Sequence, residues 1–356
     1  MKLGFGLYRH MLNDDHFRFA KQCGATHVVV HLVDYFNHAD NGKEQANQPI
    51  GKKGGWGRAG SGALWSLDEL RSLKASIEAH GLVWEAIENF DPALWYDVLL
   101  DGPRKVEQLT QLQEQIRIIG QAGIPIMGYN FSLAGVASRT TGPFARGGAV
   151  SVGMDEVDEH PIPNGMVWNM TYDEAATEGY LPRISHDELW QRLQTFLDAL
   201  VPVAEEAGVR LAAHPDDPPM PYIRSTPRLV YQPGMYQRLL DLQPSRANAL
   251  EFCLGSIAEM TEGDIYEATD QYSRQNALGY IHFRNVVGKV PHYREVFVDE
   301  GDIDMIRILR ILKKNGFEGV LIPDHTPQMT CPAPWYAGMA YAMGYMKAAL
   351  SILQRD

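Results

Sequence analysis

The chain has 356 residues, of which 45% are hydrophobic and 21% are charged, and its formal net charge at pH 7 is −12. This composition is typical of a globular protein with a large apolar core. The acidic balance and the lack of a Lys/Arg-rich stripe argue against a nucleic-acid partner, and no apolar run has the length of a membrane span.

The cysteines also bear on the compartment. The chain contains three of them, Cys23, Cys253 and Cys331, an odd and sparse set that does not resemble a disulfide framework. The N-terminal residues carry no signal-peptide pattern. Together these features predict a cytoplasmic protein.

Eight short apolar segments recur along the chain and are separated by longer amphipathic stretches. In chain order they are residues 3–8, 26–32, 82–88, 124–131, 209–214, 248–253, 278–284 and 319–325. They are nearly continuous runs of Val, Ile, Leu and aromatic residues. This pattern is typical of parallel strands that are covered on both faces.

The stretches between the strands carry helix signals. Residues 66–81 and 185–208 each begin with a Ser-x-x-Glu capping box and end on Gly. Residues 13–24 begin with Asn and Asp, and both they and residues 302–316 end on Gly. We expect Asp302 to cap the last of these helices rather than to act in catalysis.

The alternation of eight strands with helices predicts an α/β fold, the (β/α)8 TIM barrel, formed by residues 1–356 as a single domain. The alternative is an open doubly wound sheet. The number of strands disfavours it, as does the lack of a Gly-rich phosphate-binding sequence after the first strand. The final stretch, 334–353, is expected to close the barrel as a helix, with an oligomer interface as the alternative.

Two connections, after the second and fourth strands, are too long to be simple loops. They span about residues 33–64 and 132–184 and are rich in Gly. In a TIM barrel both lie at the C-terminal face, where active sites are built, so they predict lids or substrate clamps. For residues 33–64 the alternative is disordered decoration.

Polar residues at the ends of four consecutive strands predict a metal site. They are His214, Cys253, His282 and Asp324. Imidazole, thiolate and carboxylate together suit a transition metal such as Mn²⁺, Fe²⁺, Co²⁺ or Zn²⁺ and leave room for a substrate. The alternatives are a buried Cys that acts as a small hydrophobe, core histidines and an Asp that caps a turn.

Further polar residues lie beside these positions. His325 suits a general acid or base, because its unperturbed pKa lies near neutrality; the alternative is a histidine in a surface loop. Arg284 and Asn285 suit a substrate carboxylate and hydroxyl, unless Arg284 pairs with an acid of the barrel rim. Asp216 and Asp217 would orient neighbouring histidines or shape their loop.

Several segments, in the same order, resemble those of the mannonate dehydratases, a family of xylose isomerase-like TIM barrels. They are YNF at 129–131, HPDDPP at 214–219, FCLGS at 252–256, IHFRNV at 281–286, GDIDM at 301–305 and PDH at 323–325. The resemblance implies a Mn²⁺ ion on His214, Cys253, His282 and Asp324. It also implies acid/base work by His325.

The resemblance guides the choice of the remaining site residues. We expect Tyr129 or Tyr336 to be the second acid/base group beside His325. We expect Glu88, Asn130 and Arg139 to contact the substrate.

The sequence departs from the family pattern at several positions. Leu254 follows the Cys where Thr is usual, and Val136 and Ala137 replace an Asp-Trp pair before Arg139. Ile322 and Thr326 flank the PDH segment in place of Arg and Gly, and Met339 replaces an Arg. These departures bear on the substrate more than on the metal.

The leading hypothesis is therefore a metal-dependent hydro-lyase that converts D-mannonate, or a close aldonate, to 2-keto-3-deoxy-D-gluconate. One alternative is a metal-dependent isomerase or epimerase of the same barrel group. Another is a non-catalytic sugar-binding barrel, which would need no Lewis acid. The expected partner is a small sugar acid, and a homo-oligomer is possible.

Overall fold

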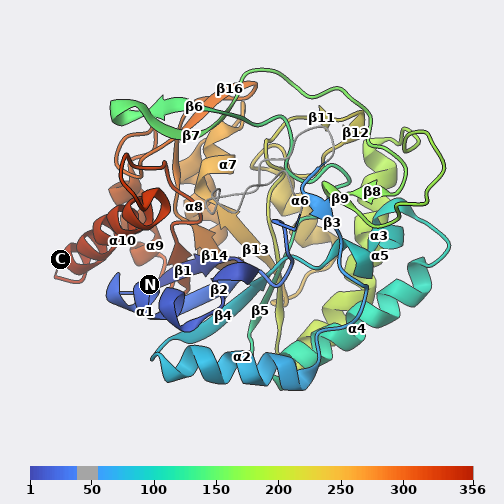
Figure 1. Ribbon diagram of the computed structural model, residues 1–356, viewed down its shortest axis with the longest axis horizontal. Helices are drawn as coiled ribbons and strands as arrows, with labels where there is room; N and C mark the ends of the chain where they lie inside the picture. Colours follow the sequence, from blue (N-terminus) through green and yellow to red (C-terminus); the bar gives the residue numbers. More distant parts are fainter. Residues whose placement is uncertain (38–54, 356) are drawn as a thin grey trace.

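The computed structural model describes residues 1–37 and 55–355. Eight parallel strands close into a barrel in chain order, which confirms the predicted fold (Figure 1). The strands are β1 (Lys2–Leu7), β2 (His27–Val30), β4 (Val83–Glu88), β5 (Ile126–Tyr129), β10 (Arg210–Ala213), β13 (Asn248–Cys253), β14 (Leu278–His282) and β17 (Val320–Ile322). The first strand pairs with both the second and the last, and so closes the ring.

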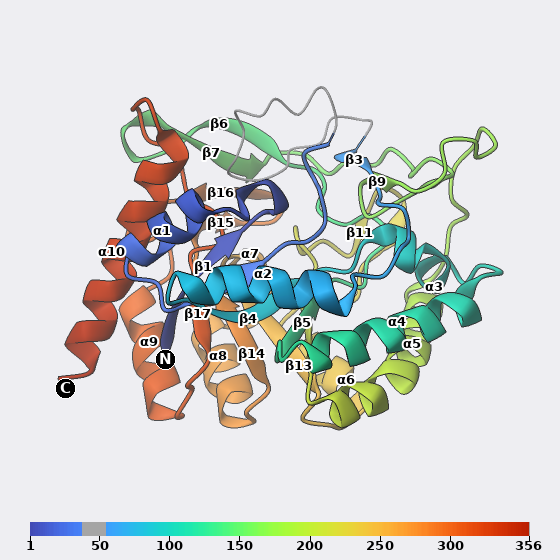
Figure 2. The ribbon, with the colours of Figure 1, turned by 60° about the horizontal axis from the view of Figure 1, so that its bottom comes forward.

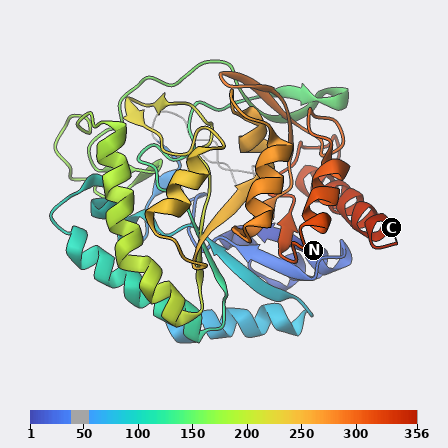
Figure 3. The ribbon, with the colours of Figure 1, turned by 180° about the vertical axis from the view of Figure 1, so that it is seen from behind.

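Helices surround the barrel on the outside (Figures 1 and 3). They are α1 (Asp14–Gln22), α2 (Leu67–Ala79), α3 (Tyr96–Leu100), α4 (Lys105–Gln121), α5 (His186–Ala207), α6 (Met235–Leu242), α7 (Leu254–Glu259), α8 (Ile265–Arg274), α9 (Met305–Lys314) and α10 (Pro334–Leu353). Three short 3-10 turns are η1 (Arg9–Met11), η2 (Pro92–Leu94) and η3 (Arg146–Gly148). The last helix contacts α9 and β1, as expected of the helix that closes the barrel. Among the described residues, no helix is both long and apolar enough to cross a membrane.

The predicted helix starts are mostly confirmed. Both capping boxes, at Ser66 and Ser185, form as expected. The assignment of Asp302 as a helix cap was wrong, because α9 begins at Met305 and Asp304 caps it by accepting from the backbone N–H of Arg307. The Asp302 carboxylate instead accepts a hydrogen bond from the backbone of Gly288, at 2.8 Å.

The interior of the barrel is filled by side chains from seven of its strands. The buried cluster consists of Val29, Ala86, Ile126, Ala212, Ala249, Tyr280, Val320 and Ile322. Small alanines on three strands leave space for the single large ring. The barrel is therefore a packed core and not a channel, and polar chemistry is confined to its ends.

The long connections form small sheets above the barrel, as Figure 2 shows. A four-stranded antiparallel sheet has the order β15 (Asn285–Lys289), β16 (His292–Val296), β7 (Ala149–Met154) and β6 (Thr140–Ala145). A three-stranded sheet has the order β3 (Gly57–Arg58), β9 (Met170–Thr171) and β8 (Met166–Val167). A two-stranded sheet consists of β11 (Tyr222–Ile223) and β12 (Thr226–Pro227).

The two long connections therefore lie where the sequence placed them, but a third was missed. Half of the four-stranded sheet is the β15–β16 hairpin, which follows β14 and precedes α9. Residues 38–54 of the first predicted lid lie outside the described residues. The action of these connections as lids stays a prediction.

Gly128 on β5 provides a test of the packing inside the barrel. A Cβ atom added there would lie 2.5 Å from the Glu251 carboxylate and 2.6 Å from the Tyr280 hydroxyl. We expect Gly128→Ala to lower the free energy of unfolding by about 1–3 kcal/mol, measured by urea unfolding, because both buried groups must shift.

Gly344→Ala is the matched control. Gly344 lies on the exposed face of α10, and nothing would contact its added Cβ within 4 Å. Its substitution should raise stability by about 0.5–1 kcal/mol, because Ala is the better helix former. Wild-type stability for Gly128→Ala would mean that the Glu251 and Tyr280 side chains do not lie across β5.

Candidate active site

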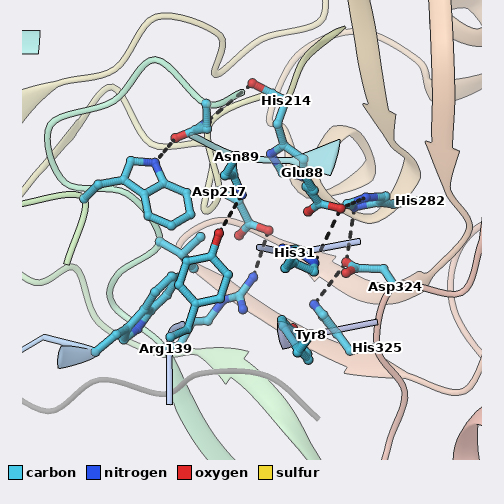
Figure 4. A pocket seen from close by; sticks show the side chains of 15 residues that line it. Tyr8, His31, Glu88, Asn89, Arg139, His214, Asp217, His282, Asp324 and His325 are labelled. Carbon is cyan, nitrogen blue, oxygen red and sulfur yellow. Dashed lines mark hydrogen bonds and ion pairs between the residues drawn. The ribbon is translucent and has the colours of Figure 1, made fainter. Parts of the chain in front are cut away.

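A pocket opens at the carboxyl ends of the barrel strands and is lined by polar and aromatic side chains (Figure 4). The lining residues are Tyr8, His31, Tyr35, Trp56, Glu88, Asn89, Asn130, Val136, Arg139, Trp168, His214, Asp217, His282, Asp324 and His325. They come from strand ends and from the connections after them. Seven of the predicted site residues thus meet in one pocket, and Cys253 lies beside two of them.

Three of the four predicted metal ligands come together. One ligand atom each from His214, Cys253 and His282, on neighbouring strand ends, all lie within 4.8 Å of one another. The fourth, Asp324, is not a member of this group, but its Oδ2 lies 3.3 Å from Nδ1 of His282. Its φ of 62° is in the left-handed region, an uncommon conformation for a residue other than glycine that is often found at functional sites.

The chemistry of these side chains fits a cation. Burial raises the pKa of the Cys253 thiol, but Arg284 and a hydrogen bond with His214 outweigh burial and hold it well below its usual range. The thiolate is the form that binds metals. Burial lowers the pKa of His214, but Cys253 and Glu251 raise it to about 9, so a metal would replace a proton there. The buried ring nitrogens of His282 have no hydrogen-bond partner of good geometry in the described chain.

A second group of possible ligands lies beside the same histidine. Nε2 of His282 is 3.3 Å from Oε2 of Glu88 and 3.2 Å from Oε1 of Glu251. Burial and the negative charge of Glu88 raise the pKa of Glu251 to about 8. Burial also opposes ionisation of Glu88, but His31 and His282 lower its pKa to about 2. Glu88 is therefore the ionised carboxylate of the pair, and it alone lines the pocket.

His325 lies on the other side of Asp324. Its Nε2 is 3.2 Å from Oδ2 of Asp324, and its Nδ1 is 2.9 Å from Oε2 of Glu295. The ring is thus held between two carboxylates. It lines the pocket, where Figure 4 shows it beside Asp324. Glu295 comes from the β15–β16 hairpin, and the sequence analysis did not single it out.

Of the two arginines predicted to contact the substrate, one lines the pocket and the other does not. Arg284 is 3% exposed and does not line the pocket; it donates to Asp217 at 2.7 Å and to Glu259 at 3.0 Å. The alternative reading, that Arg284 pairs with acids of the rim, therefore describes the structure. Arg139 does line the pocket, and its Nη2 donates to Asp217 at 2.9 Å.

Besides Arg284, three predicted site residues lie away from the pocket. Tyr129 points outward from β5 and packs on Phe196 of α5, with ring centroids 5.0 Å apart. Tyr336 lies on α10, where its hydroxyl is 3.1 Å from Nε2 of His16. Asn285 uses its amide to hold the backbone of residues 298 and 303, so it fastens the hairpin segment and does not face a substrate.

Asn130 lines the pocket, but its amide is already engaged. It donates to the carbonyl of Pro215 and accepts from the indole N–H of Trp168, both at 3.1 Å. The acids of the HPDDPP segment shape the loop: Asp216 accepts from the backbone of residues 229 and 230, and Asp217 binds the two arginines.

The sequence analysis missed an aromatic wall of the pocket. Tyr8 stacks on His31 at 4.6 Å, and Trp56 meets Tyr35 and Trp168 edge to face at 5.4 and 5.3 Å. Tyr8 and His31 directly follow strand segments, so the strand-end rule applied to the first two strands would have found them. The two tryptophans lie in long connections, where no sequence spacing marks them.

In the folded, metal-free protein the pKa of Glu251 is about 8, whereas the pKa of an ordinary Glu is 4.5. The Glu251–Glu88 pair therefore keeps one proton up to about pH 8. The folded state binds more protons across that range, so stability falls as the pH rises through it. We expect Glu251→Gln to show a smaller fall, measured by urea unfolding of metal-free protein at several pH values. Glu114→Gln, at an exposed position of α4, should keep the wild-type slope. Equal slopes for Glu251→Gln and wild type would contradict the raised pKa.

A closed barrel of eight parallel strands, with its pocket at the carboxyl ends of the strands, defines the TIM-barrel class of proteins. The fold matches the crystal structure of a xylose isomerase domain protein from Planctomyces limnophilus with a TM-score of 0.59 at 12% identity, over 100% of this chain and 99% of that one. This likeness shows the fold alone.

The family follows from closer matches. The model of the D-mannonate dehydratase (UxuA) family matches residues 51–354. The mannonate dehydratase of Streptococcus pneumoniae (strain 70585) is 31% identical over 280 residues, 74% of this chain and 75% of the relative. The crystal structure of mannonate dehydratase from Streptococcus suis serotype 2 has a TM-score of 0.77 at 25% identity, covering 99% of this chain and 95% of that one. The chain belongs to the D-mannonate dehydratase family, and it is a hydro-lyase that acts on sugar acids.

Proposed function

We propose that this protein is a divalent-metal-dependent dehydratase of D-mannonate, or a close aldonate, and forms 2-keto-3-deoxy-D-gluconate. The observation that carries the proposal is the meeting of His214, Cys253 and His282 at a pocket that His325 also lines, in a chain of this family. The reaction removes the C2 proton and the C3 hydroxyl as water, and the resulting enol becomes the 2-keto group.

His214, Cys253, His282 and Asp324 would hold the cation. Their mixture of nitrogen, sulfur and oxygen suits Mn²⁺ and also Fe²⁺, Co²⁺ or Zn²⁺. A divalent cation bound there acts as a Lewis acid that stabilises negative charge on the substrate when its C2 proton is lost. The thiolate form of Cys253 supports this assignment.

In this proposal His325 is the residue that transfers the proton. An imidazole accepts a proton in its neutral form and donates one in its protonated form, and this ring lines the pocket. The hydroxyls of Tyr129 and Tyr336 lie elsewhere, whereas Tyr8 lines the pocket. Burial raises the pKa of Tyr8 well above its usual value, so its hydroxyl stays protonated and donates to a substrate oxygen.

The remaining lining residues bind and enclose the substrate. Glu88 and Arg139 supply the charged groups that face the sugar-acid hydroxyls, and Asn130 fixes the nearby backbone. The indoles of Trp56 and Trp168 cover the carbon chain and exclude water from it.

The proposal predicts metal-dependent loss of water. Protein stripped with a chelator and reloaded with Mn²⁺ is incubated with D-mannonate, and the product is identified by mass spectrometry. We expect a 2-keto-3-deoxy acid only after reloading. A product of unchanged mass would instead favour an isomerase or epimerase, and equal turnover without metal would contradict metal dependence.

A second prediction tests the ligand set. Cys253→Ser should weaken metal binding by more than about 100-fold, measured by metal titration, because a hydroxyl replaces the thiolate. Cys23→Ser is the matched control, since Cys23 lies at the end of α1, and it should bind metal as the wild type does. Unchanged binding by Cys253→Ser would shift the site to the Glu88, Glu251 and His282 group.

A further inference from the structure

Glu295 reaches the active site from a strand outside the barrel. It lies on β16, which pairs with β15 of its own hairpin and with β7 of the connection after β5. The hydroxyl of Ser151 on β7 donates to the backbone carbonyl of Glu295 at 2.6 Å. The Glu295 residue is 4% exposed. Its backbone is therefore fixed from both sides and its carboxylate is shielded from water.

The carboxylate contacts His325 at one ring nitrogen. Oε2 of Glu295 lies 2.9 Å from Nδ1 of His325. An ionised carboxylate only accepts hydrogen bonds, and a neutral ring has a single N–H for the two carboxylates that face it. The contact with Glu295 is the shorter one, 2.9 Å against 3.2 Å for Nε2 and Oδ2 of Asp324, so the geometry favours the hydrogen on Nδ1. Nε2 is then the nitrogen without a proton, beside the Asp324 carboxylate that would bind the cation.

The other carboxylate oxygen is held by positive charge. Oε1 lies 3.4 Å from Nη1 of Arg284 and 3.8 Å from Nη2 of Arg139. Burial raises the pKa of Glu295, but His325 and Arg284 outweigh burial and lower it. Glu295 therefore stays ionised in a buried position and remains an acceptor for the imidazole.

We propose that Glu295 is the positioning residue for His325: it fixes the ring and the tautomer, and so presents Nε2 for proton transfer with the substrate. A carboxylate that orients a catalytic imidazole serves the same purpose in other enzymes. The inference deepens the proposed function and depends on it for the role of His325. The alternative is that Glu295 only neutralises Arg284 and Arg139.

The first test is a double-mutant cycle on Mn²⁺-loaded protein with D-mannonate as the substrate. Glu295→Gln keeps the size of the side chain but removes its charge and adds a donor. We expect kcat to fall about 10- to 100-fold, with little change in KM or metal content. In the His325→Ala background the same change should have no further effect on kcat. An equal loss in both backgrounds, or no loss in the wild type, would overturn the inference.

Glu259→Gln is the matched control. Glu259 is also buried and its Oε1 accepts from Nη1 of Arg284 at 3.0 Å, but it has no contact with His325. Burial and nearby carboxylates hold its pKa well above the usual value, so the amide imitates the protonated acid. We expect kcat within about twofold of wild type; a loss as large as that of Glu295→Gln would mean that the effect arises from the surroundings of Arg284 and not from His325, and would overturn the inference.

A second measurement does not require turnover. In Zn²⁺-loaded protein with ¹⁵N-labelled histidine, the His325 signals, assigned by their loss in His325→Ala, should show a proton on Nδ1. Glu295→Gln should mix the two tautomers, and an unchanged spectrum would overturn the inference. If wild-type protein fails to dehydrate D-mannonate, the proposed function fails, while this spectrum still decides whether Glu295 fixes the ring.

Discussion

One carboxylate oxygen joins the segments that build the pocket. Oδ2 of Asp217 accepts hydrogen bonds from Arg139, Arg284 and the hydroxyl of Ser256, which come from three different connections of the barrel. All of these groups are buried or nearly so, and a buried charge is tolerated only when it is paired. The loss of one partner would leave the others uncompensated. This requirement explains why both arginines pair with acids.

The sequence indicated the barrel and three side chains that meet as possible metal ligands, because these features are local. A strand and the residue that follows it are read from a few neighbouring positions, and parallel strands of a barrel bring their ends together. The outward direction of Tyr129 follows from its place in the strand. Gly128 faces the barrel interior beside Glu251, so Tyr129 must point outward, since neighbouring side chains in a strand alternate.

The pairing of Arg284 and the hairpin that carries Glu295 had no such signal. Which acid an arginine meets depends on segments far apart in the chain, such as Asp217 and Glu259 around Arg284. The β16 strand pairs with β7, more than a hundred residues earlier, and nothing in its own sequence specifies that partner.

The structure shows that most of the residues that depart from the family pattern lie outside the pocket. Leu254, Ile322 and Met339 are buried hydrophobic residues of the core, so these positions concern packing. Among the departing positions only Val136 lines the pocket. Differences in sugar-acid preference within the family would therefore be sought first around Val136 and not across the whole barrel.

The sheet of β6, β7, β16 and β15 connects two loops of the barrel by backbone hydrogen bonds, the one after β5 and the one after β14. One of them carries Arg139 and the other carries Glu295, and both side chains meet Arg284 or its partner Asp217. Exchange of either connection alone for that of a relative would break a shared sheet and displace the other. Grafting of new specificity onto this barrel therefore requires the two connections to be transferred as a pair.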